Sequence, residues 1–73
     1  MINNETVQIW LDDLLEMTGK ATLAELTADE LSAEVEEVKG TIENEKIWGN
    51  EHNIIDLEEY LCVLNKMLAG KEM

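Results

Sequence analysis

Residues 27–42 read TADELSAEVEEVKGTI, and this stretch decides the fold. Its large apolar residues recur at intervals of four, three and four positions: Leu31, Val35, Val38 and Ile42. This spacing places them on one narrow helical face, as in the contact seam of a coiled coil. Ile47 and Trp48 follow and are expected to close the seam. The stretch therefore predicts a helix over about residues 28–48 that packs one face against a partner helix.

Both ends of this helix are marked in the sequence. Thr27 and Glu30 have the spacing of a capping box, in which each side chain accepts a hydrogen bond from the other residue's backbone N–H. Gly49 stands where a helix commonly stops. Gly40 falls inside the helix, where glycine costs about 1 kcal/mol relative to alanine. It marks either a close crossing of helices or a weak point.

A second apolar seam lies near the C-terminus. It has the same four-three-four spacing and consists of Leu57, Leu61, Leu64 and Leu68. Ile54 extends this seam, and Tyr60 and Met67 broaden it on one side. Asn53 is a candidate N-cap and Gly70 a candidate stop, which predicts a helix over about residues 54–69. The turn between the two seams is short, so the two helices should form an antiparallel hairpin.

A third amphipathic helix is expected over about residues 5–18. Asn4 is suited to cap its N-terminus, and Gly19 to end it. Its apolar face consists of Val7, Trp10, Leu11, Leu14 and Thr18. Thr22 and Glu25 have the spacing of a second capping box, which predicts a single helical turn between the first two helices.

These elements predict an all-α fold, a small three-helix bundle built on an antiparallel helical hairpin, with residues 1–73 forming one domain. The first helix should cover the hairpin. Ile9, Ile55 and Cys62 lie off the apolar faces of their helices. Either the first helix uses Ile55 and Cys62, or a second copy of the protein packs on all three. A homodimer is therefore an open alternative.

Charge is the strongest compositional signal. Seventeen acidic residues face five lysines, and the net charge is −12. Binding to nucleic acid needs cationic groups to neutralise phosphates, so direct nucleic-acid binding is excluded, and an anionic membrane would repel this surface. A functional charge would select a basic protein partner. Alternatively, the charge only keeps the protein soluble.

The acidic residues of the central helix form two rows beside its apolar seam. One row contains Glu30, Glu34 and Glu37, and the other contains Asp29, Glu36 and Glu43. Rows of carboxylates on a rigid helix could imitate a nucleic-acid backbone and bind a basic surface. Alternatively, they are ordinary solvated flanks.

No catalytic or cofactor-binding pattern is present, and we expect neither enzymatic activity, nor a cofactor, nor a specific metal site. His52 is the only histidine, lies in the predicted turn and has no partner at ligand spacing. Cys62 stands mid-helix in an acidic protein, which disfavours a thiolate, so we expect a buried small apolar residue. The N-terminal residues lack the pattern of a signal peptide, and a free cysteine fits a reducing compartment, so we expect a cytoplasmic location.

Two segments carry a resemblance to other proteins. Residues 38–48, VKGTIENEKIW, and residues 53–60, NIIDLEEY, resemble small uncharacterised helical-hairpin proteins of phages and mobile elements of Gram-positive bacteria. The resemblance covers about the last half of the chain and contains no catalytic motif. It implies a mobile-element origin, and no binding residues can be transferred from it.

The sequence thus supports a non-enzymatic protein-interaction module, such as a mobile-element accessory protein or inhibitor that binds a basic protein surface. The alternative is a helical module that self-associates in an assembly. A third hypothesis is cation binding by the pairs of adjacent acidic residues, which lack any known ligand pattern. These pairs are Asp12 and Asp13, Asp29 and Glu30, Glu36 and Glu37, and Glu58 and Glu59.

Overall fold

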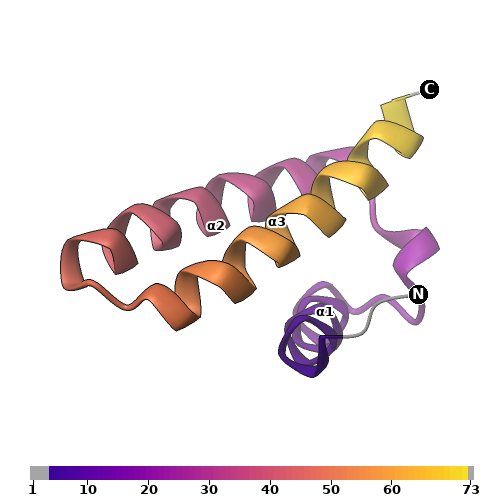
Figure 1. The fold of residues 1–73 in the computed structure, drawn as a ribbon. Coiled ribbons are helices and arrows are strands. Elements are labelled where there is room, and N and C mark those ends of the chain that lie inside the picture. The colour runs from indigo at the N-terminus through magenta and orange to yellow at the C-terminus, as the bar shows by residue number, and fades with distance from the viewer. Residues whose placement is uncertain (1–3, 73) are drawn as a thin grey trace.

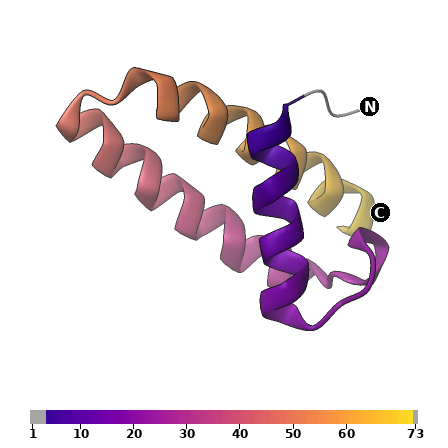
Figure 2. The same cartoon turned by 90° about the horizontal axis from the view of Figure 1, so that it is seen from below.

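Three α-helices and one 3-10 turn make up the computed structural model, which describes residues 4–72. In chain order these are α1 (Glu5–Thr18), η1 (Leu23–Glu25), α2 (Ala28–Trp48) and α3 (Glu51–Glu72). α2 and α3 lie side by side and antiparallel, and α1 crosses them on the half of the hairpin away from their turn (Figures 1 and 2). The predicted three-helix bundle on an antiparallel hairpin is confirmed.

The core forms where the three helices meet. All four seam residues of α2 are buried, as their spacing predicted. The buried side chains of the other elements are Val7, Leu11 and Leu14 of α1, Leu26 between η1 and α2, and Leu57, Tyr60 and Leu64 of α3. Each helix therefore contributes one apolar face to a single shared core.

The buried face of α3 lies to one side of the predicted leucine seam, on the side that Tyr60 was expected to broaden. Tyr60 is only 2% exposed, whereas Leu61 and Leu68 are half-buried. α3 packs against both α2 and α1, and the Trp10 ring of α1 lies 5.4 Å from the Tyr60 ring between centroids. A helix with two neighbours needs a wider buried face than a two-helix seam, and the second neighbour draws that face toward Tyr60.

The expectation that Ile47 and Trp48 close the seam of α2 was wrong. Their side chains are 80% and 73% exposed. Continued past Ile42, the same spacing reaches Glu45 and Gly49, so Ile47 and Trp48 stand on other sides of the helix. α1 also stays on the far half of the hairpin and gives them nothing to pack against (Figure 2).

The turn between α2 and α3 is shorter than expected. Gly49 adopts the left-handed conformation, with a φ of 73°, and ends α2 as predicted. Gly19 ends α1 in the same way, with a φ of 71°. α3 then begins at Glu51, and Asn53 lies inside it instead of capping it. The Asn50 amide donates to the Glu45 carboxylate at 2.7 Å, which ties the turn back to α2. Gly49 and Asn50 are thus the only residues between the two helices, because the left-handed glycine turns the chain sharply at the end of α2.

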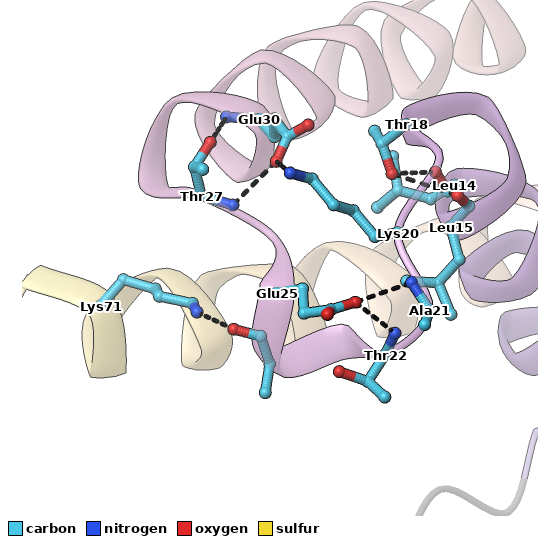
Figure 3. A network of polar contacts seen from close by, with 11 residues as sticks. Leu14, Leu15, Thr18, Lys20, Ala21, Thr22, Glu25, Thr27, Glu30 and Lys71 are labelled. Atoms are coloured by element: carbon cyan, nitrogen blue, oxygen red, sulfur yellow. Dashed lines mark hydrogen bonds and ion pairs between the residues drawn. The ribbon is translucent and has the colours of Figure 1, made fainter.

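Gly70 does not end α3, which continues to Glu72 instead of stopping near residue 69. Glycine ends a helix most readily in the left-handed conformation, and in the described residues only Gly19 and Gly49 have positive φ. The Lys71 ammonium donates to the Ala24 carbonyl oxygen of η1 (Figure 3). This contact lies in the last turn of α3 and links it to η1.

Local hydrogen bonds fix the start of each element that the sequence marked. The Asn4 side chain accepts from the backbone N–H of Thr6 at 2.9 Å and caps α1. The capping box of α2 is complete, with bonds of 2.9 and 3.1 Å between Thr27 and Glu30 (Figure 3). In η1 the Glu25 carboxylate accepts from two backbone N–H groups, which lowers its pKa because they stabilise the charged form. These caps place the connection between α1 and α2 on the end of the hairpin.

Candidate functional site

A groove opens between α1 and the hairpin, on the side toward the α2–α3 turn. It encloses about 400 Å³. α1 lines it with Trp10, Asp13, Leu14 and Met17, α2 with Glu34, Glu37, Val38, Thr41 and Glu45, and α3 with Asn53, Leu57 and Tyr60. The groove exists because α1 covers only one half of the hairpin face (Figure 2).

The floor of the groove is apolar and aromatic. Leu14, Val38 and Leu57 are core residues whose edges reach the groove. The rings of Trp10 and Tyr60 meet at a tilt of 48° along the α1 side. Tilted contacts of this kind favour the ring edge of one partner against the face of the other. The floor is thus built from side chains that the fold already holds in place.

Four carboxylates stand around this floor: Asp13 from α1 and Glu34, Glu37 and Glu45 from α2. No lysine lines the groove. The lysines that form ion pairs in the described residues are Lys20, Lys39 and Lys46, and their partners are Glu30, Glu36 and Glu43. Among residues 4–72, none of the four groove carboxylates forms an ion pair with a lysine. We call this site the acidic groove.

Tyr60 links the floor of the acidic groove to its rim. Its hydroxyl donates to Glu34 Oε2 at 2.6 Å. Burial, followed by the bond to Glu34 and the nearby charges of Glu34, Glu37 and Asp13, raises the pKa of Tyr60 well above its ordinary value. The hydroxyl therefore stays protonated and acts as a donor that orients the Glu34 carboxylate.

The structure separates the six acidic residues that the sequence placed on two flanks of α2. Glu34 and Glu37 line the acidic groove. Glu30 caps α2 and lies 3.9 Å from Lys20. Glu36 and Glu43 lie 3.9 and 3.7 Å from lysines one helical turn away. Asp29 is exposed in the first turn of α2. Two of the six thus share a concave site, and four lie outside it.

Asp13 and Glu45 are groove residues that sequence reasoning missed. Asp13 belongs to a set of acidic residues on α1 that point away from its apolar face, and Glu45 occupies a seam position beyond Ile42. The carboxylate at that seam position was a usable signal, because a charge there implies that the seam ends in solvent. Asp13 carried no such signal, since its placement depends on how α1 crosses the hairpin.

The three residues proposed for self-association all lie at the surface. Ile9 and Ile55 are exposed, Ile55 by 65%, and Cys62 is an exposed free thiol. The expectation that Cys62 is a buried apolar residue was wrong, because the buried face of α3 turns toward Tyr60 and Leu64 and leaves position 62 outside. α1 does not cover Ile55 or Cys62. These two stand seven residues apart on one face of α3.

His52 and Cys62 lie too far apart to form one site. His52 lies in the first turn of α3, not in a loop, and is exposed. It stands ten residues from Cys62, or about 15 Å along the helix axis. Within the described part of the chain, no three histidine, cysteine, aspartate or glutamate side chains are arranged to hold a metal ion. None of the helices described is long and apolar enough to span a membrane.

Comparison with known proteins found no matching protein-family model, no matching curated protein and no matching solved structure.

Proposed function

We propose that this protein is a non-enzymatic interaction module that binds a basic surface of another protein. The observation that carries the proposal is the acidic groove, where four carboxylates surround an apolar floor without a lysine beside them. Charged rims around an apolar centre are the usual arrangement of protein-binding surfaces. The sign of the rim here selects a cationic partner.

The remaining acidic residues would act at longer range. Asp29, Glu30, Glu36 and Glu43 add to the negative field on α2, although lysines offset three of them locally. Such a field speeds the encounter with a basic partner and weakens as salt screens it, with a screening length of about 8 Å at physiological ionic strength. Glu34 and Glu37 would then make the close contacts.

The non-enzymatic part of the proposal is supported by the positions of His52 and Cys62. Each is exposed on α3, and the distance between them is too great for them to act on one substrate atom. Acid–base or nucleophilic catalysis requires positioned neighbours for such groups.

The expected class of partner is a basic, nucleic-acid-handling protein of the cytoplasm, with the present protein as an accessory or inhibitor from a mobile element. Two features support this class: the rows of carboxylates on α2, which can occupy a surface that binds phosphates, and the resemblance of residues 38–48 and 53–60 to small hairpin proteins of phages and mobile elements. By occupying that surface, the present protein would displace a nucleic acid from the partner.

The proposal is tested by affinity capture from a Gram-positive bacterial lysate at low and high ionic strength. Captured proteins are identified by mass spectrometry, and each candidate is then purified and its association rate measured against salt. Basic partners whose association slows steeply with salt would support the proposal. Acidic partners, or partners indifferent to salt, would overturn it.

Self-association is a second candidate function, favoured by the exposure of Ile55 and Cys62 on one face of α3. Light scattering over a range of concentrations, at high salt to screen the net charge, gives the oligomeric state. A dimer that Ile55→Glu dissociates would support this candidate, and Ile9→Glu would show whether α1 takes part. A monomer at every concentration would exclude it.

A further inference from the structure

We propose that the acidic groove receives one amphipathic helix of the partner, with its apolar face on the Trp10–Tyr60 floor and lysine or arginine residues along its flanks. This inference rests on the proposed function and narrows it from a basic surface to one class of segment. The helix would lie beside α1 and cross the same face of the hairpin, on the half that α1 leaves open (Figure 2).

The dimensions of the groove suit a single helix. On α2 its lining runs from Glu34 to Glu45. The eleven residue-to-residue steps from Glu34 to Glu45 correspond to about 16 Å along the helix axis, and a helix with its side chains is about 10–12 Å across. Part of this length lies under the edge of α1, so the open part admits one helix and not two. A docked helix would complete a second layer over the hairpin.

The chemistry of the floor selects apolar anchors. Leu14, Val38 and Leu57 present their edges, and Met17 at the rim is an exposed apolar side chain of high adaptability. Helices that bind in grooves use anchors at i, i+3, i+4 and i+7. The described residues contain no β-strand, so pairing with an extended peptide at a sheet edge is not available to them.

The rim decides the charge of the occupant. A helix without cations would cover Asp13, Glu34, Glu37 and Glu45 and remove water from them without compensation, which is unfavourable. Lysine or arginine at the flanks of the bound helix would form ion pairs with these carboxylates and replace the lost hydration. A second copy of this protein is disfavoured for the same reason, because each chain carries a net charge of −12.

The test uses the groove's own tryptophan as a reporter. Trp10 lines the groove and Trp48 stands exposed near the turn, so Trp48→Phe leaves Trp10 as the single tryptophan. The probe is a synthetic peptide of leucine and lysine, capped at both ends, whose leucines fall on one helical face. A peptide of the same composition with its leucines spread around the helix serves as the control.

Matched variants separate the groove from the general surface charge. Asp13→Asn with Glu37→Gln removes two charges from the rim. Asp12→Asn with Glu16→Gln removes two exposed charges of α1 that do not line the groove. For the apolar part, Met17→Ala is compared with Ile47→Ala, since both side chains are exposed and only Met17 lines the groove. All these side chains lie outside the core, so the variants should remain folded, which circular dichroism checks.

We expect saturable binding of the amphipathic peptide with a change in Trp10 fluorescence. The rim variant should weaken it about tenfold, as expected for two exposed ion pairs, and the Asp12/Glu16 variant by less than twofold. Equal binding of both peptides, or equal effects of both charge variants, would overturn the proposal that a helix binds in the groove. The broader proposal that the protein binds a basic surface would still stand. If neither peptide binds at low salt, both proposals fail.

Discussion

The Tyr60 hydroxyl of α3 donates a hydrogen bond of 2.6 Å to the Glu34 carboxylate of α2, and this bond joins the core to the rim of the acidic groove. The tyrosine ring is buried against Trp10, and its hydroxyl bonds to a carboxylate that is partly exposed at the groove. One side chain therefore contacts both α1 and α2 from α3 and also orients a carboxylate at the rim of the acidic groove. The same residue provides a test of the electrostatics of the site.

Tyr60→Phe should lower stability by about 1 kcal/mol at neutral pH, because one hydrogen bond to a half-exposed carboxylate is lost. The difference in stability between the original protein and the variant should shrink at alkaline pH. The folded state raises the pKa of Tyr60, so its stabilising effect is complete below the unfolded value of about 10 and is lost as the pH rises above it.

Urea denaturation of both proteins at about pH 8 and about pH 11 measures this difference. The lysines titrate in both proteins, so the comparison isolates Tyr60. Parallel loss of stability in the two proteins would show that Tyr60 titrates normally in the folded state.

Gly40→Ala should stabilise the protein by about 1 kcal/mol. No atom lies within 4 Å of a Cβ built at Gly40, and its φ is not positive. The glycine is therefore a weak point of α2 and not a close crossing, and alanine reduces the freedom of the unfolded chain.

Gly49→Ala provides the contrast, since its surroundings are equally open and its φ is +73°. It should destabilise the protein, because alanine is strained in the left-handed conformation. Thermal melting distinguishes the two variants. Shifts of the same sign would mean that backbone conformation does not separate these sites.

Leu26→Ala should cost about 2–5 kcal/mol, since Leu26 is fully buried between η1 and α2. A chain of this length has a total stability of about 4–11 kcal/mol, so the variant loses a large share of it. Ile47→Ala, at an exposed position, should change stability by less than about 0.5 kcal/mol. Urea midpoints give both values, and a small effect at Leu26 would mean that η1 packs loosely.

Thr27→Ala should cost about 1 kcal/mol, because its hydroxyl accepts from the Glu30 backbone N–H at 3.1 Å and completes the capping box of α2. Thr41→Ala is the control. Its hydroxyl donates to the Glu37 carbonyl oxygen in the interior of the helix. Loss of this bond does not remove a helix cap. Thermal melting of the two variants measures the difference, and equal losses would argue against a capping role for Thr27.

Much of the fold followed from local chemistry. The seam of Leu31, Val35, Val38 and Ile42 and the caps at Asn4, Thr27 and Gly49 act within one or two helical turns, so they can be identified in the sequence alone. The net charge of −12 is likewise a property of composition. Two groove carboxylates, Glu34 and Glu37, were already placed on one flank of α2.

The rest was decided by the way α1 crosses the hairpin. That crossing shifts the buried face of α3 away from Leu61 toward Tyr60, leaves Trp48 and Cys62 exposed, and brings Asp13 next to carboxylates that lie more than twenty residues further along the chain. Helical periodicity shows which side of a helix is apolar, but it does not show which part of a neighbour that side covers. The sequence by itself determined the helices, their ends and the acidity of the surface, whereas only the packing of α1 on half of the hairpin created a groove where that acidity surrounds an apolar floor.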